Sequence, residues 1–164
     1  MAKSDSFFIR ASVDTNGITF AQSAVDLGAY VDALGKTVLR IHNIAVQYGD
    51  NGVDAPVIPP GQHRIGFAIT TQSQGALVGA DDRSVIATGS LFATDDAQGN
   101  AFLSESLDVA PQHWTNGYLV GVEQIYLATD ATVDLDIGSI NVVMECTVET
   151  LSQSAAMALA LSQQ

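Results

Sequence analysis

The sequence predicts an all-β domain of about eight antiparallel strands, folded as a sandwich or a barrel. Segments rich in β-branched and aromatic residues recur along the 164 residues, and clusters of Gly, Pro, Asn and Asp separate them. The spacing of these turn signals is typical of strands in sandwiches and barrels. The longest such segment, Thr37–Tyr48, contains no Gly or Pro and therefore predicts one long strand.

Both faces of this long strand mix apolar and polar side chains. Successive side chains on a strand point to opposite faces, so each face needs its own environment. One face would carry Val38, Arg40, His42, Ile44, Val46 and Tyr48, and the other Leu39, Ile41, Asn43, Ala45 and Gln47. Because neither face is plainly the one turned to water, we expect this strand inside a sandwich, or between a core and a second contact surface.

The segments before the long strand contain clear turn signals. Residues 7–15 and 18–25 are predicted to form a hairpin, because Asn16-Gly17 between them is the strongest short hairpin signal. Residues 29–34 fit either a helical turn or a short strand. After the long strand, residues 49–62 are rich in Gly, Pro and Asp and predict a loop.

Further strands are predicted over the rest of the domain, with a polar turn at residues 95–100 and a loop at residues 110–117. The expected strands are 63–71, 84–94, 101–109, 117–129 and a last strand or strand pair at 140–151. We expect the core to contain these residues: Ile41, Ile44, Phe67, Ile69, Phe92, Leu119, Ile125, Val142 and Met144.

The β-domain is expected to span residues 1–151, followed by a helical tail or arm at residues 152–164. The tail, SQSAAMALALSQQ, is rich in strong helix formers and contains no Gly or Pro. Its apolar residues run consecutively, so a helix here would need burial on several sides. Since one small sandwich cannot easily bury such a helix alone, we expect the tail to dock on a neighbouring subunit.

The charge of the chain disfavours contact with anionic partners. The net charge is −12, from 18 acidic and 6 basic residues. The basic residues are scattered and form no arm or stripe that could neutralise phosphates. We therefore expect no direct nucleic-acid binding and no binding to an anionic membrane surface. Hydrophobic residues make up 47%, which excludes a disordered chain.

Cys146, the single cysteine, cannot form a disulfide within the chain. Its place in the apolar segment INVVMECTV favours a buried hydrophobic residue over a nucleophile. No secretory signal is visible at the N-terminus, and no apolar run has the ~20 residues of a transmembrane helix. We expect no transmembrane segment and synthesis in a cytoplasm.

No motif predicts a nucleotide, metal or cofactor site. Gly35-Lys36-Thr37 resembles the end of a phosphate-binding loop, but Tyr30 stands where that motif needs its first Gly, and a strand follows instead of a helix. The histidines, which could converge with an Asp on a metal, are His42, His63 and His113. They lack the spacing of metal ligands, so we interpret them as ordinary sheet and loop residues.

The acidic loops are interpreted as a solvated rim in which Asp side chains support local turns, with calcium binding as the alternative. These loops contain Asp81-Asp82, Asp95-Asp96 and Asp130, Asp134 and Asp136. None matches the spacing of an EF-hand.

No residue is assigned a catalytic role. Ser, His and Asp are present without a G-x-S-x-G elbow, and a carboxylate pair for glycoside hydrolysis would need a geometry that a sequence does not show. Trp114, the single tryptophan, follows His113 in a proline-containing loop. We interpret it as a plug closing one end of the sandwich, with a sugar-stacking platform as the alternative.

Two stretches, DALGKTVLRIHNIAVQY and APQHWTNGYLVGVEQIYLATD, look similar to uncharacterised structural proteins of marine viruses. Together with the eight predicted strands and the broad Pro/Gly loops, the chain resembles the single jelly-roll capsid proteins of tailless icosahedral viruses. The resemblance implies a jelly-roll β-sandwich, self-assembly into a shell, contacts with other virion proteins and a place in the virion. Many small jelly-roll capsid proteins carry a basic N-terminal arm for the genome, and MAKSDSFF does not supply one.

Two other classes of function stay open. One is a carbohydrate- or receptor-binding β-sandwich, such as a viral fibre domain, with a site formed by Trp114, Tyr118 and the Asp-rich loops. The other is an enzyme on a β-sandwich, such as a polysaccharide hydrolase or lyase. The mean hydropathy of +0.22 favours the self-assembling protein, because it indicates more apolar surface than a lone monomer tolerates.

Overall fold

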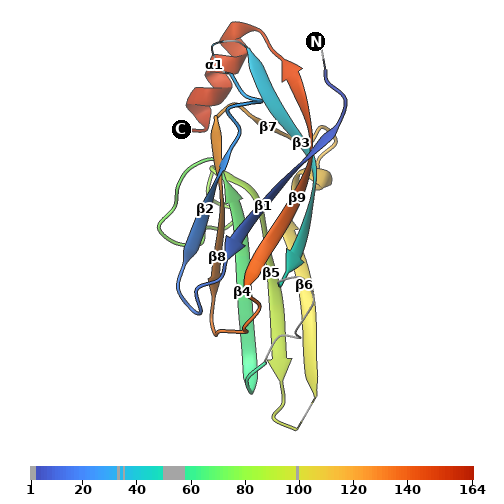
Figure 1. Ribbon diagram of the computed structural model, residues 1–164, viewed down its shortest axis with the longest axis vertical. Helices are drawn as coiled ribbons and strands as arrows, with labels where there is room; N and C mark the ends of the chain where they lie inside the picture. Colours follow the sequence, from blue (N-terminus) through green and yellow to red (C-terminus); the bar gives the residue numbers. More distant parts are fainter. Residues whose placement is uncertain (1–2, 33, 35, 50–57, 99) are drawn as a thin grey trace.

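A computed structural model of the chain describes all residues except 1–2, 33, 35, 50–57 and 99. Nine strands, one 3-10 turn and one α-helix lie in the described residues (Figure 1). The strands are β1 Phe7–Asp14, β2 Ala21–Asp26, β3 Thr37–Tyr48, β4 Gly61–Thr70, β5 Val85–Asp95, β6 Ala101–Val109, β7 Tyr118–Val120, β8 Gln124–Ala131 and β9 Ser139–Thr150. The turn η1 spans Pro111–His113 and the helix α1 spans Gln153–Ser162.

The strands form two antiparallel sheets packed face to face. The four-stranded sheet has the order β1-β9-β3-β7, and the five-stranded sheet has the order β2-β8-β4-β5-β6. The pairs β1/β9, β2/β8, β3/β7 and β4/β5 therefore alternate between the two sheets, as when one long antiparallel ribbon is rolled up. This is the strand order of a jelly roll, and it confirms the predicted fold class. The additional strand, β6, extends the five-stranded sheet at its edge.

The core lies between the sheets and follows their alternation. In β4, Ile65, Phe67 and Ile69 share the inner face and are almost fully buried, as predicted. In β9, Ile140, Val142, Met144 and Cys146 are equally buried and alternate with the half-buried residues Asn141, Val143 and Glu145. Period-two alternation in these two strands thus places one apolar row from each sheet in the shared core.

A β-bulge at His42 changes which residues of β3 face the core. Pairing with β9 shifts between Ile41 and Asn43, so His42 is an extra residue without an opposite partner. Before the bulge Leu39 and Ile41 are buried, and after it Ile44 takes over the inner face. The prediction that Ile44 shares a face with Arg40 was wrong, because simple alternation ignores the inserted residue.

Two predicted connections are also corrected by the structure. The turn at Asn16-Gly17 is present, but β1 and β2 belong to different sheets and form no hairpin. The predicted strand 117–129 is broken at Gly121 into β7 and β8, which again lie in different sheets. Both segments cross from one sheet to the other, and such crossings are what a rolled ribbon requires.

Seven of the nine predicted core residues are buried, whereas Phe92 and Leu119 are not. Phe92 is 45% exposed, because the inner face of β5 is taken by its neighbours Leu91 and Ala93. Leu119 is only half-buried on the short edge strand β7. The free ends of β4, β5 and β6 project beyond the four-stranded sheet (Figure 1).

The C-terminal tail is helical, as predicted, but it packs against its own sandwich. The hydroxyl oxygen of Ser152 caps the helix by accepting a hydrogen bond from the Ala155 amide at 3.3 Å. Ala156 and Ala160 are buried against the body, and Met157 and Leu161 are 43% and 69% exposed. The expectation that the helix docks on a neighbour therefore differs from the contact seen within one chain.

The burial of Phe67 and the exposure of Phe92 predict very different costs of truncation. Phe67→Ala should lower the free energy of unfolding by about 3–5 kcal/mol, since a buried ring leaves a cavity. Phe92→Ala should cost about 1 kcal/mol or less, as expected for a surface position. Urea denaturation of both variants measures the difference, and equal costs would contradict the assignment of faces in β5.

Candidate functional site

Trp114 lies at the surface, in the short connection between η1 and β7. Trp114 is 42% exposed. Its ring centroid lies 6.1 Å from that of Tyr118, at an interplanar angle of 42°. The interpretation of Trp114 as a buried plug was therefore wrong. In this segment Pro111 is buried and Gln112 forms hydrogen bonds to the sandwich, whereas the indole ring of Trp114 lies at the surface.

Gln112 binds the edge of β3 with both ends of its side-chain amide. Its Oε1 accepts a hydrogen bond from the Ile44 amide at 3.2 Å, and its Nε2 donates to the Ile44 carbonyl at 3.0 Å. The short strand β7 pairs with β3 only at Leu39, Arg40 and Ile41. The side-chain amide of Gln112 thus forms the hydrogen bonds at Ile44, where β7 no longer pairs with β3.

Arg40 and Glu149 form a buried, two-fold hydrogen-bonded ion pair next to this edge. Arg40 Nε donates to Glu149 Oε1 at 2.7 Å, and Arg40 Nη2 donates to Oε2 at 2.8 Å. Arg40 Nη1 also donates to the carbonyl of Asn116, so one guanidinium ties β3, β9 and the Trp114 loop together. These hydrogen bonds lower the pKa of Glu149 and raise the pKa of Arg40.

Gly117 holds this loop close to β3. Its φ is +64°, a left-handed conformation that glycine adopts at little cost. A Cβ at this position would collide with the carbonyl oxygen of Ile41. Only glycine therefore lets the chain turn from the Trp114 loop into β7 at this distance from β3.

His42, the bulge residue, lies on the outer face beside the ion pair. Its Nε2 is 2.9 Å from the hydroxyl oxygen of Thr147. Burial lowers the pKa of His42, and the nearby charges of Lys3 and Arg40 lower it further. Lys3 Nζ lies 3.9 Å from Glu149 Oε1. These residues form a small polar cluster on the outer face, where the lowered pKa favours the neutral form of His42.

The other histidines and the acidic loops lie apart from this cluster. His63 Nε2 binds the carbonyl of Pro59 at 3.0 Å, and His113 is exposed in η1. The carboxylates of Asp82, Asp95, Asp96 and Asp134 each accept hydrogen bonds from residues two to four positions further on. Loop Asp side chains therefore support local turns, as interpreted from the sequence. Of the Asp-rich loops, Asp81-Asp82 adjoins Arg83, which shares a shallow groove with Tyr118.

Two further sequence features have a clear structural setting. Cys146 is fully buried in the core, and burial raises the pKa of its thiol to about 12, which confirms its interpretation as a hydrophobic residue. Lys36 has a positive φ of 72°, and Thr37 begins β3 directly. Gly35 lies outside the described residues, and the segment after it leads into a strand, as expected.

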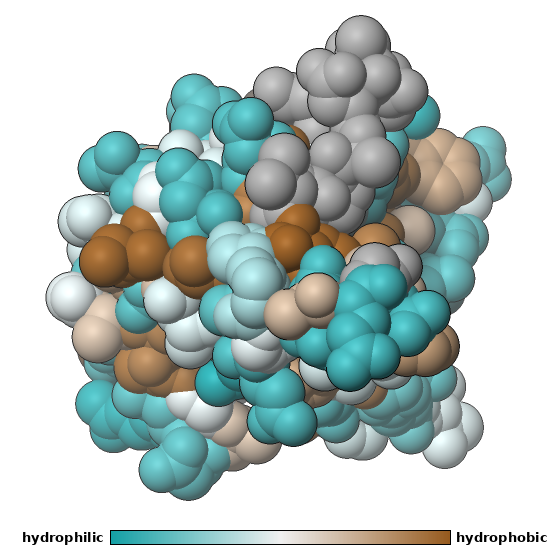
Figure 2. Space-filling view, turned by 90° about the horizontal axis from the view of Figure 1, so that it is seen from below, coloured by the Kyte–Doolittle hydropathy of each residue, from teal (hydrophilic) through white to brown (hydrophobic). Residues whose placement is uncertain are grey.

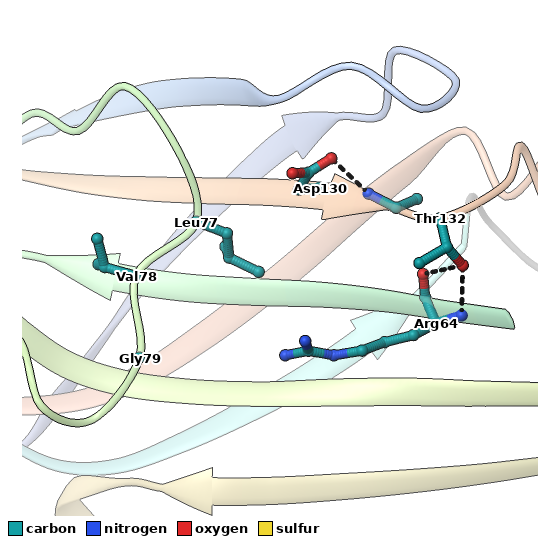
Figure 3. A pocket seen from close by; sticks show the side chains of 7 residues that line it. Arg64, Leu77, Val78, Gly79, Asp130 and Thr132 are labelled. Atoms are coloured by element: carbon teal, nitrogen blue, oxygen red, sulfur yellow. Dashed lines mark hydrogen bonds between the residues drawn. The ribbon is translucent and has the colours of Figure 1, made fainter.

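A groove of about 340 Å³ lies on the outer face of the five-stranded sheet (Figure 3). The loop carrying Leu77, Val78 and Gly79 folds over β4 and forms one wall, and Arg64 points along the floor. Arg64 Nε donates to the hydroxyl oxygen of Ser90 at 2.8 Å. Asp130 lines the groove on β8, but its Oδ1 accepts a hydrogen bond from the Ala131 amide.

A group of exposed apolar side chains lies on the projecting end of β5 and β6. Phe92, Phe102 and Leu103 are 45%, 70% and 50% exposed. Pairing places Phe92 opposite Ser104 and Thr94 opposite Phe102, so both rings share the outer face, and Leu103 points to the inner face. Figure 2, which views this end of the molecule, shows apolar surface running between polar side chains. We call these three residues the β5–β6 tip.

Sequence reasoning missed the ion pair and the β5–β6 tip for different reasons. Arg40 is the one Lys, Arg, Asp or Glu residue of β3, and Glu149 is one of two in β9, so opposite charges in two apolar strands were a usable signal for a buried pair. Phe102 and Leu103 alternate as a buried strand would, so nothing local shows that the facing sheet is shorter. Gln112 carried no signal.

Comparison with protein-family models and with curated proteins found no match for this chain. In the part of the chain that the structure describes, no helix is long and apolar enough to cross a membrane. Among the same residues, no three His, Cys, Asp or Glu side chains are grouped so that they could hold a metal ion.

The Arg40–Glu149 pair predicts a pH-dependent contribution to stability. Glu149→Gln should cost about 2 kcal/mol at pH 7, because charged hydrogen bonds are lost from a buried site. The pKa of Glu149 is lowered on folding, so its contribution is present above the unfolded-state pKa of about 4.3 and disappears as pH falls through the lower folded-state value.

The measurement is urea denaturation of the parent protein and Glu149→Gln at pH 7, 5.5 and 3.5. The difference between the two should be constant at the upper two values and shrink at the lowest. Both proteins carry His42→Gln as a background substitution, because Glu149 raises the pKa of His42 and the titration of His42 would otherwise enter the difference. Glu105→Gln, an exposed glutamate on β6, is the matched control and should change stability little. A difference that grows on acidification would contradict the role given to Glu149.

Proposed function

We propose that this chain is a virion structural protein that self-assembles into an icosahedral capsid and has no enzymatic role. The strand order supports the proposal, because the jelly roll is a recurrent architecture of viral capsid domains. Fold alone does not determine function, so the argument rests on the surface. In the proposed virion the chain contacts copies of itself and other virion proteins, after synthesis in the host cytoplasm.

The observation that carries the proposal is the exposure of Phe92, Phe102 and Leu103 at the β5–β6 tip. Large apolar side chains gathered at one place on a surface mark contacts with other proteins. The tip is apolar on both faces of the sheet, because Phe102 lies on one and Leu103 on the other. β6 is also an edge strand, with backbone groups on one side that no strand among the described residues pairs. Such an end suits repeated contacts between identical subunits.

The charge of the chain shapes how such contacts would form. Asp95 ends β5 and Asp96 follows it, and Glu105 lies on β6 two residues after Leu103. With a net charge of −12, like charges meet when subunits approach, so salt or calcium should favour assembly. The same charge argues that other components, or an inner membrane, face the genome in place of this chain.

Light scattering after size exclusion tests self-assembly. The wild type should elute as rings, pentamers, hexamers or larger bodies, and higher salt should shift it toward them. Phe102→Ser should shift it toward the monomer, because it removes the most exposed ring of the tip. Phe8→Ser is the matched control, since Phe8 is 59% exposed on β1, in the other sheet. A clean 17.1 kDa monomer at high concentration and moderate salt would rule out the proposal.

The exposed Trp114 favours a second candidate function, a carbohydrate- or receptor-binding module. An indole ring that is 42% exposed beside Tyr118 offers an apolar face on which a sugar ring can stack. Arg83 and Ser162, which line the neighbouring groove with Tyr118, supply polar groups for hydroxyls. In this alternative the site is the Trp114–Tyr118 pair with the Asp81-Asp82 loop, and the distant Asp-rich loops take no part.

Trp114→Ala separates this candidate from a purely structural role. The substitution should lower the free energy of unfolding by about 1 kcal/mol or less, because the ring is exposed. If Trp114 is a platform, a glycan array that shows binding by the wild type should show none by the variant. Tyr30→Ala is the control, an exposed aromatic residue that stacks on Phe7 instead. Absence of glycan binding by the wild type would exclude the module.

A further inference from the structure

The C-terminal helix is held to the sandwich mainly by one glutamine just beyond its end. Gln163 is buried, and its Oε1 accepts a hydrogen bond from the Gly121 amide at 2.8 Å. Its Nε2 donates to the Leu119 carbonyl at 2.7 Å. Its own carbonyl accepts a hydrogen bond from Gln72 Nε2 at 3.4 Å. The side chain of Gln163 thus meets the backbone groups of β7 with which a further strand would pair.

The apolar part of this contact is small. Only Ala156 and Ala160 are buried among the residues of α1, and each contributes one methyl group. Leu159 packs over Gly121, where an added Cβ would lie 3.0 Å from the Leu159 Cγ. The larger side chains Met157 and Leu161 face away from the body. Little buried apolar surface means that the helix opens more easily than the core does.

The connection to the helix is short. Leu151 and Ser152 alone separate β9 from α1, and the Leu151 amide donates to the carbonyl of Lys36 at 2.9 Å. A short hinge favours exchange between chains, because the element leaves its own body when the hinge extends. Leaving uncovers the Leu119 carbonyl and the Gly121 amide, which then need a partner.

We infer that α1 exchanges between subunits, so that Gln163 of one chain binds Leu119 and Gly121 of another. The occupant is specified by the site, since the helix that fits over Gly121 and ends in the matching amide is the helix of a second copy. The same hydrogen bonds form whether the helix comes from the same chain or from a neighbour. The inference builds on the proposed self-assembly and names one of its contacts.

Disulfide trapping between two single-cysteine variants tests the exchange. Gly121→Cys and Leu159→Cys are mixed under mild oxidation, so that a helix docked on the other chain brings the two sulfurs together. Because a side chain at position 121 contacts the resident Leu159, the wild-type NOE measurement described below must agree before a dimer counts as exchange. Non-reducing gels should show a covalent dimer about tenfold above that formed with Leu161→Cys in place of Leu159→Cys, because docking raises the effective concentration. Cys146 is fully buried and does not interfere.

The double variant Gly121→Cys/Leu159→Cys in one chain checks the geometry. If it closes an internal bridge and the mixture gives no dimer above the control, the helix stays on its own chain and the inference is wrong. For the wild type, isotope-filtered NOEs between labelled and unlabelled chains report contacts from Leu159 to Gly121 across chains, and their absence in assembled protein has the same meaning. Assembly without exchange would leave the proposed function intact. Exchange without assembly larger than the exchanged oligomer would contradict the proposed capsid and leave the inference about α1 intact.

Discussion

The β-bulge at His42 is the constraint on which the four-stranded sheet depends. In β9 the inner row runs without interruption from Ile140 to Val148, with every second residue facing the core. β3 must match this row along its whole length, yet its own sequence changes phase at His42. One inserted residue restores the match, so that Ile41 meets Cys146 and Ile44 meets Met144. Because of this insertion, Ile44 after the bulge faces the same core as Leu39 and Ile41 before it.

The bulge also determines what lies outside. It leaves Arg40 and His42 on the outer face near the start of β3, beside Glu149 and Thr147 of β9. The guanidinium of Arg40 then holds the loop that carries Trp114, and Gly117 lets the same loop approach β3. The position of the exposed indole ring thus follows from a register change in the strand beside it. Structure at the surface and packing in the core are two results of one inserted residue.

The sequence predicted the elements that local residue patterns specify. It did not predict features that depend on how the chain crosses between the two sheets. Residues 63–71 alternate cleanly and form β4 with Ile65, Phe67 and Ile69 inside, and the Ala-rich tail is helical because propensity and a serine cap agree. The segment 117–129 has strand composition throughout, so only its crossing between sheets explains the break at Gly121. Phe92 was misplaced because both neighbours, Leu91 and Ala93, were equally suitable for the core. The Trp114 loop could not be placed, since its orientation is set by Gln112 and Ile44, which are far apart in sequence.

Gln112 and Gln163 solve a problem that every open sheet shares. A strand at an edge offers its amides and carbonyls to any other chain, and a peptide that accepts them exposes an edge of its own. A side-chain amide has one donor group and one acceptor suited to the same two bonds, but it ends there and presents no new row. At each of these edges, the last hydrogen bonds are therefore made by a side chain, with which no further strand can pair. At these two edges, an incoming strand therefore finds the backbone groups already bound by a side chain.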